Sequence, residues 1–302
     1  FNGSNDDDLQ FTRATVSAWR MDNGCYCQPQ TETIERLIGL QAAAWGNRKT
    51  PVCVMLMDEP RGASLSHIAD CPVCAEVFRG WLRDDLAVPL EDLGQSTWSA
   101  VAPVSDPSVG ALYYYSQKFR TKALADFLRL QTSIVERLWP GSPPTAVNLS
   151  DGALYHASMY GQGTDYWELF GSRAVTMAWS EDWCNVAATY ELGGYNVALL
   201  RADSGQRGQP IGTYLISSFG RKPLDVKLKA SSAIANGANV LQAYFYGPSY
   251  TSHEDGWYGK VPMHSAMAEV CKEVGGAEDL LVGAKRARAD VAIIYSRASD
   301  IW

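Results

Sequence analysis

The sequence is poor in charge and in histidine, and these shortages exclude several classes of protein. Only 20% of the 302 residues are charged and the net charge is -7, so we expect no basic surface that could hold a nucleic acid backbone. No apolar run reaches the roughly 20 residues of a membrane-spanning helix, so we expect no membrane partner. The four histidines lack metal-ligand spacing, and the glycine pairs at 161–163 and 193–194 resemble turns more than phosphate loops. We therefore expect no organic cofactor.

Apolar and aromatic residues, in contrast, are plentiful. At 46% hydrophobic, a chain of this length can bury a sizeable core, which excludes a disordered protein. The 10 Trp and 15 Tyr outnumber the 8 Phe. Flat rings with a polar edge suit the faces of sugars as well as protein cores. This composition favours a sugar-binding protein only weakly, because the same rings can fill a core.

The apolar residues alternate between strand-like and helix-like segments. Near-continuous apolar runs, as in strands buried on both faces, cover residues 51–57, 144–148, 174–179, 211–216 and 239–246. Apolar residues at three-to-four spacing predict helices over residues 31–45, 74–84, 115–139 and 226–236, and a further long helix around residues 263–274. Strand followed by helix, repeated, predicts an α/β fold with a parallel sheet.

The number of strand-helix units suggests a barrel that is incomplete in this chain. Five clear units and an irregular segment at residues 9–24 fall short of the eight units of a (β/α)8 TIM-type barrel. We expect the first units to precede Phe1, in a longer protein. Residues 1–282 would then form the partial barrel, and residues 283–302, with the apolar run 289–295, would begin a second domain.

Two adjacent acids end the first apolar strand. Asp58 and Glu59 stand where parallel α/β folds carry their active sites. Glu59 is a candidate general acid, because apolar walls raise the pKa of a carboxyl group. The alternative is a solvated acid in a turn, and spacing alone gives the two interpretations equal weight.

A second acidic pair follows the strand that ends near residue 179. Glu181 and Asp182 lie between Trp179 and Trp183. Carboxylates among indole rings suit the cleavage of a glycosidic bond, in which one acid protonates the leaving oxygen and another attacks carbon or activates water. Alternatively, one acid caps the next turn and the tryptophans belong to the core.

Four cysteines form two close pairs. Cys25 and Cys27, with Cys71 and Cys74, offer four soft ligands that suit a tetrahedral structural zinc. Two disulfides are the competing interpretation, but bridges within such short pairs are strained. Zinc-like spacing favours a reducing compartment, so the cytoplasm is slightly preferred.

Several segments together resemble glycoside hydrolase family 42, the β-galactosidase type. The resemblance runs from about residue 15 to the end, and the motifs that carry it are Asp58-Glu59 with the segments 71–82, 93–99, 119–131, 233–238, 264–267 and 291–296. It implies a (β/α)8 retaining glycosidase acting on a carbohydrate, with a cysteine-held zinc. It also implies a second, amidotransferase-like domain associated with trimers, so the full-length protein is expected to be a homo-trimer.

The resemblance assigns the acid/base role to Glu59 but does not assign a nucleophile. Asp58 stands where the family has Asn, and the cysteines split two and two rather than one and three. The stretch 212–220, where the family's nucleophile falls, contains no carboxylate. Glu181 is the nearest replacement, as nucleophile or base, with Asp182 the other choice. A carboxyl separation of about 6.5–9.5 Å would make the enzyme inverting, whereas about 5 Å would make it retaining.

The predicted function is therefore a glycoside hydrolase cleaving a β-galactoside-like bond, with Glu59 as acid and Glu181 as nucleophile or base. A catalytically inactive carbohydrate-binding protein derived from a glycosidase is the main alternative, and an incomplete barrel with neither function is the third. Expected substrate contacts are Asp58, Asn148, Trp179, Asp182, Trp183 and Tyr246, with Arg20 and Asp22 from the N-terminal loop.

Overall fold

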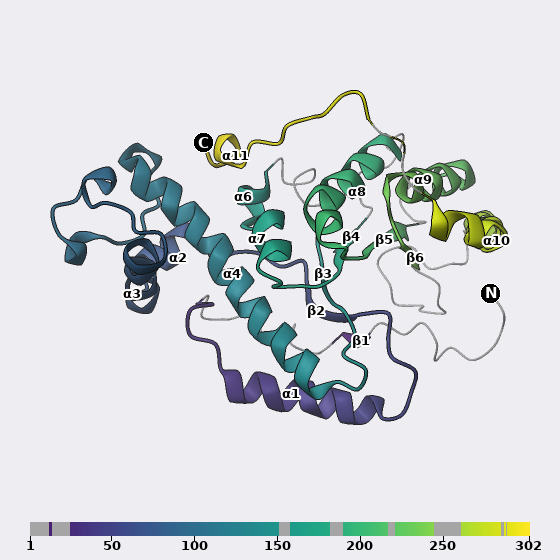
Figure 1. Cartoon of the computed structure of the whole chain (residues 1–302), viewed down its shortest axis with the longest axis horizontal. Coiled ribbons are helices and arrows are strands. Elements are labelled where there is room, and N and C mark those ends of the chain that lie inside the picture. The colour runs from purple at the N-terminus through teal and green to yellow at the C-terminus, as the bar shows by residue number, and fades with distance from the viewer. Residues whose placement is uncertain are drawn as a thin grey trace.

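The described residues form six parallel strands in sequential order. The structure is a computed structural model of all 302 residues and describes residues 12–13, 25–150, 158–181, 190–216, 221–244, 261–284, 287 and 289–302. The strands are β1 (Thr12–Arg13), β2 (Val54–Asp58), β3 (Thr145–Asn148), β4 (Ala178–Ser180), β5 (Ile211–Ile216) and β6 (Val240–Tyr244). They make two three-stranded parallel sheets, β1-β2-β3 and β4-β5-β6, and a parallel bridge between Leu149 and Ser180 joins the two (Figure 1).

Helices follow the strands and cover the sheet. They are α1 (Thr31–Trp45), α2 (Leu65–Asp70), α3 (Pro72–Gly80), α4 (Ala111–Leu138), α6 (Met159–Gln162), α7 (Tyr166–Gly171), α8 (Tyr190–Ser204), α9 (Pro223–Asn236), α10 (Val261–Gly283) and α11 (Arg297–Ile301). A π-helical turn, Trp81–Asp85, extends α3. Short 3-10 turns lie at Glu91–Leu93, Trp98–Ala100, Pro107–Val109 and Gly205–Arg207. In the described residues, no helix is long and apolar enough to cross a membrane.

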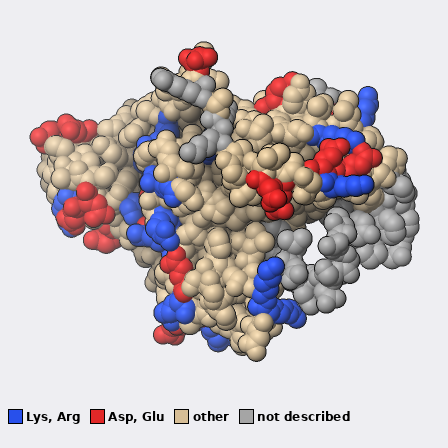
Figure 2. Space-filling view, turned by 45° about the vertical axis from the view of Figure 1, so that its right-hand side comes forward, with Lys and Arg blue, Asp and Glu red and all other residues tan. Residues whose placement is uncertain are grey.

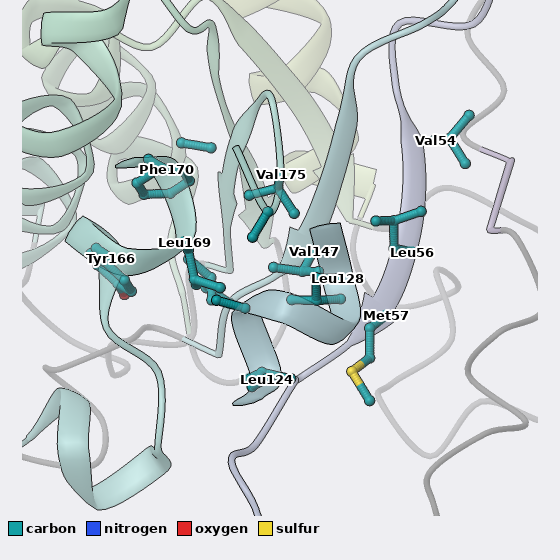
Figure 3. Packing of buried hydrophobic residues seen from close by; sticks show 14 of the residues in the cluster. Val54, Leu56, Met57, Leu124, Leu128, Val147, Tyr166, Leu169, Phe170 and Val175 are labelled. Atoms are coloured by element: carbon teal, nitrogen blue, oxygen red, sulfur yellow. The ribbon is translucent and has the colours of Figure 1, made fainter. Parts of the chain in front are cut away.

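The two faces of the sheet bury different sets of side chains. On the helix-covered face, Val54 and Leu56 of β2 pack with Leu124 and Leu128 of α4 and with apolar residues of α7 (Figure 3). The opposite face gathers a second cluster from four strands, with the members Cys53, Met55, Ala146, Met177, Trp179, Tyr214 and Ile216. Successive strand residues point to opposite faces, so both faces must be apolar, and this accounts for the near-continuous apolar runs.

The parallel α/β prediction is confirmed, but barrel closure is not observed. Within the described ranges, β1 pairs with β2 and β6 pairs with β5, and no pairing joins β1 to β6. The predicted helix at residues 31–45 and the strand at 211–216 match α1 and β5 residue for residue. The predicted strand at 174–179 is regular only from Ala178, because the N–H groups of Thr176 and Met177 both donate to the Thr145 carbonyl instead of forming a ladder.

One expectation about local structure was wrong. Gly193 and Gly194 do not form a turn but lie inside α8, where a Cβ on Gly194 would come within 2.4 Å of Ser232 Oγ on α9. Glycine at this position therefore allows the two helices to pack closely. The run 289–295 is not a strand, and Ile294 is 90% exposed there. Acidic and basic side chains are interspersed over the face shown in Figure 2.

The segment after residue 283 returns to the sheet domain through α11. Ile301 is buried in the main core cluster, and Arg297 pairs with the fully buried Asp165 at 3.1 Å. Asp300 Oδ2 accepts the Tyr160 backbone N–H at 3.1 Å. These contacts anchor the last residues on α6 and α7. A second domain beginning at residue 283 stays a prediction.

We expect Gly212→Ala to destabilise the fold by about 1–3 kcal/mol, the usual effect of forcing extra atoms into a packed core. A Cβ at position 212 would lie 1.9 Å from Cε3 of the Trp179 ring. Urea unfolding measures the loss. Gly275→Ala in α10 is the control, because nothing lies within 4 Å of its Cβ, and it should gain about 0.5–1 kcal/mol. Equal stability of the two variants would contradict the packing described.

Candidate active site

The carboxyl ends of three neighbouring strands bring the predicted acids together. Asp58 is the last residue of β2 and pairs in register with Asn148, the last residue of β3. Glu181 directly follows β4, and its N–H donates to the Leu149 carbonyl at 2.9 Å. Parallel strands end at the same edge of a sheet, so their terminal side chains share one site.

Asn148 is the centre of this site. Its side-chain Nδ2 donates to Asp58 Oδ1 at 2.8 Å and to Glu181 Oε1 at 2.6 Å. The two carboxylate oxygens therefore lie within two hydrogen-bond lengths of each other. Asn148 is 2% exposed and Glu181 is 8% exposed, so these charge-assisted bonds form away from bulk water.

Glu59 lies beside this group in an unusual backbone conformation. Its φ of 44° is in the left-handed region, which a residue with a side chain rarely adopts. The Glu59 N–H donates to the Asn148 carbonyl at 2.9 Å, and Ser150 Oγ donates to Glu59 Oε1 at 3.1 Å. The left-handed residue turns the chain sharply away from β2 and leaves the Glu59 side chain half-buried. Strain of this kind often occurs at functional sites.

A small cavity lies on the other side of Glu181. Asn196 and Lys229, both buried, line it together with Thr213. Asn196 Nδ2 donates to Ser180 Oγ at 2.8 Å, and Ser180 Oγ donates to the Leu149 carbonyl at 2.9 Å. These bonds hold the end of β4 against β3, and with it the backbone that carries Glu181.

Sequence reasoning missed Ser150, Asn196 and Lys229. Ser150 carried a usable signal, because it follows a predicted strand end by two residues. Asn196 and Lys229 come from α8 and α9 and have no motif around them. Their place in the site depends on how these helices pack on β5.

The predicted substrate contacts have different outcomes. Asp58 and Asn148 lie in the site, as described above. Trp179 is fully buried, with its ring 5.3 Å from that of Tyr214 in an edge-to-face contact. It is placed as a core residue and presents no face to a sugar, so the expected contact is corrected. Five further predicted residues lie outside the described residues: Arg20, Asp22, Asp182, Trp183 and Tyr246.

The four paired cysteines also meet in space. The sulfur atoms of Cys25, Cys27 and Cys74 all lie within 4.8 Å of one another. Cys25 Sγ is 3.5 Å from Cys74 Sγ and 3.6 Å from Cys71 Sγ. All four thiols are free, so the disulfide alternative does not describe this arrangement.

The crowding of thiols changes their pKa values. Burial, together with the side-chain hydrogen bonds that join Cys25 to Cys74 and Cys71, raises the pKa of Cys25 to about 12. A hydrogen bond to the Cys27 side chain, together with burial, also raises the pKa of Cys74. Burial acts in the same direction on Cys71, but hydrogen bonds from the Cys74 backbone and from the neighbouring thiols lower its pKa overall.

Comparisons with known proteins point to β-galactosidases. No family model matches the chain. It is 25% identical over 161 residues to Beta-galactosidase Pbg of Clostridium perfringens. The aligned region covers 48% of this chain and 22% of that protein. The fold is similar to the solved β-galactosidase of Bacillus circulans sp. alkalophilus, with a TM-score of 0.65, 16% identity and coverage of 86% of this chain and 41% of that one.

Two further solved structures agree. The polyextremophilic β-galactosidase of the Antarctic haloarchaeon Halorubrum lacusprofundi gives a TM-score of 0.65 at 14% identity, covering 91% of this chain and 45% of that one. The β-galactosidase of the psychrophilic Marinomonas ef1 gives 0.61 at 11% identity, covering 85% and 44%. The chain thus has the fold of a large part of these TIM-barrel glycosidases, and it spans about a fifth to under a half of each relative's length.

Removing the shared amide should cost more stability than removing an ordinary one. We expect Asn148→Ala to lower the free energy of unfolding by about 3 kcal/mol at pH 7, because the buried Glu181 and the half-buried Asp58 lose a charge-assisted donor. Asn148→Asp should lose more, since it adds a third acid. The control is Asn236→Ala, which removes one neutral bond to the Ser232 carbonyl and should cost about 1 kcal/mol. Urea unfolding that shows equal losses for both alanine variants would contradict the role of Asn148.

Proposed function

We propose that this protein is a glycoside hydrolase that cleaves a β-galactoside-like bond, with Glu59 as general acid and Glu181 as nucleophile or base. The observation that carries the proposal is that Asn148 contacts both residues: its backbone carbonyl accepts the Glu59 N–H, and its side chain donates to Glu181 Oε1. These contacts lie at the carboxyl edge of a parallel sheet whose fold is that of β-galactosidases. Most glycoside hydrolases cleave the glycosidic bond with two carboxyl groups, one on each side of it.

The surroundings of Glu59 suit the acid role. It is half-buried, so its carboxyl group can reach a bound substrate, and Ser150 fixes one oxygen. In the reaction, Glu59 would give its proton to the glycosidic oxygen as the bond from that oxygen to the sugar carbon breaks. Protonation matters because an unprotonated alkoxide is a poor leaving group.

The surroundings of Glu181 hold its carboxyl group in one orientation. Asn148 donates to Oε1 and fixes the orientation of the side chain. As positive charge develops on the sugar ring, Glu181 would either attack the anomeric carbon or take a proton from an attacking water. The stereochemistry of the first-formed product, followed by NMR, distinguishes the two routes.

Cleavage should depend strongly on both acids. We expect Glu59→Gln to lower kcat/KM by about 10²–10⁴-fold on an alkyl β-galactoside, because the leaving oxygen loses its proton donor. The same variant should lose much less on a dinitrophenyl galactoside, whose leaving group needs no proton. Glu181→Gln should lose activity on both substrates.

The exposed Glu136 provides the control, and Glu136→Gln should keep wild-type rates. Full activity of Glu59→Gln on every glycoside would remove this residue from the mechanism. Sugar binding by calorimetry without any turnover of the wild type would favour the alternative, an inactive carbohydrate-binding protein.

We also propose that Cys25, Cys27, Cys71 and Cys74 hold a structural zinc. Tetrahedral sulfur ligands about 2.3 Å from zinc lie about 3.8 Å from one another. The distances of 3.5 and 3.6 Å from Cys25 Sγ to its two neighbours fit that spacing closely. Such a zinc would join the segment before α1 to the start of α3 and would supply no chemistry to the reaction.

Zinc content tests this second proposal. We expect one zinc per chain by native mass spectrometry, and Cys27→Ser should reduce it and lower the melting temperature. A strong chelator should lower the melting temperature of the wild type and leave Cys27→Ser unchanged. Cys271→Ser is the control, because Cys271 is exposed and distant in sequence from the cluster. Chains free of metal that carry two disulfides would overturn the proposal.

A further inference from the structure

The loop that follows Glu59 is held by side chains from other parts of the chain. Glu59 has a left-handed φ of 44°, so its conformation costs free energy and persists only where the surroundings impose it. The next residues leave the strand without a ladder, and three successive carbonyls, of Arg61, Gly62 and Ala63, accept hydrogen bonds from side chains. Two of these three bonds come from Arg120 of α4.

Arg120 connects two loops at the rim of the site. Its Nε donates to the Ala63 carbonyl at 2.9 Å, and its Nη2 reaches the Gly62 carbonyl at 3.5 Å. Its Nη1 donates to the Tyr160 carbonyl of α6 at 2.9 Å and to Gln117 Oε1 at 3.2 Å. One guanidinium thus fixes the loop after β2 to the segment after β3.

The two loops touch at a pair of glycines beneath this guanidinium. The Gly62 N–H donates to the Gln162 carbonyl at 3.1 Å. A Cβ on Gly62 would come within 2.7 Å of the Gly163 carbonyl oxygen, and a Cβ on Gly163 would come within 2.7 Å of Arg120 Nη2. Gly163 also has a φ of 78°, in the left-handed region. The contact therefore leaves no room for a side chain at position 62 or at position 163.

Among the described residues, the Arg120 guanidinium donates mainly to backbone carbonyls and not to a carboxylate. In the described part of the chain, no carboxylate forms an ion pair with Arg120, and burial lowers its pKa from the usual value. Placing a cation there is costly, and a hydrophobic side chain would fill the same space more cheaply. The flat guanidinium has donors in fixed directions, which lysine lacks, so it can hold carbonyls from two loops at once.

We propose that Arg120 is a positioning residue for Glu59: it locks the loop 59–63 against α6 and so aims the carboxyl group of the general acid. Tyr26 assists, since its hydroxyl donates to the Arg61 carbonyl at 2.7 Å. The inference rests on the proposed function, because it assumes that Glu59 donates the proton. It goes further in assigning the geometry of that acid to a residue outside the catalytic group.

The dependence on the leaving group tests this role. We expect Arg120→Lys to lower kcat/KM on an alkyl β-galactoside at least 10-fold more than on a dinitrophenyl galactoside, because only the first needs the proton from Glu59. A loss of folded protein would lower both rates equally. Guanidinium added to Arg120→Ala should restore part of the lost ratio. Tyr26→Phe, which keeps the ring packed 5.1 Å from Phe127, should shift the ratio in the same direction by less.

A matched arginine provides the control. Arg79 also donates to a backbone carbonyl, that of Val101, but lies on α3 away from Glu59. Arg79→Lys should leave the ratio of the two rates unchanged. Equal losses on both substrates for Arg120→Lys would assign Arg120 to stability alone and overturn the positioning role.

A second measurement separates this inference from the proposed function. Hydrogen exchange followed by mass spectrometry should show faster exchange in peptides covering residues 59–65 of Arg120→Lys than of the wild type, with α9 peptides unchanged. Unchanged exchange at 59–65 overturns the inference whatever the activity. A wild type that cleaves no glycoside while Arg120→Lys exchanges faster at 59–65 would instead overturn the proposed function.

Discussion

The site depends on one amide group between two carboxylates. Asn148 ends β3, which lies between β2 and β4; β2 ends in Asp58, and Glu181 follows β4. Two like charges close together repel each other less when a donor lies between them. The Asn148 amide has two hydrogens and gives one to each side. The parallel strands set the distance between Asp58 and Glu181, and the two hydrogen bonds from Asn148 reduce the repulsion between them.

Around this centre, the molecule holds the loop after Glu59 from two directions. Arg120 reaches it from α4, and Tyr26 reaches it from the segment that contains Cys25 and Cys27. A metal bound by the cysteines would therefore fix a residue that contacts the loop after Glu59. Structural zinc and catalytic geometry would then be linked through a single hydroxyl group.

The sequence predicted those parts of the fold that depend on local periodicity. The helix at 31–45 and the strand at 211–216 carry their pattern in every residue, so their bounds were correct. Positions in the site were predictable where they follow a strand end, as for Asp58 and Asn148. Trp179 was not, because an indole beside an acid looks the same in sequence whether it faces a sugar or lies over Gly212. Arg120 lies inside an ordinary amphipathic helix, and only the meeting of two distant loops gives it a role.

The left-handed backbone at Glu59 places stability and the proposed activity in opposition. Glycine or asparagine would adopt this conformation more easily than glutamate does. A search for more stable variants would therefore tend to select replacements at this position and at the same time select against the carboxyl group. If Glu59 is the proposed general acid, the tight turn that carries it makes it one of the residues that directed evolution for stability would remove first.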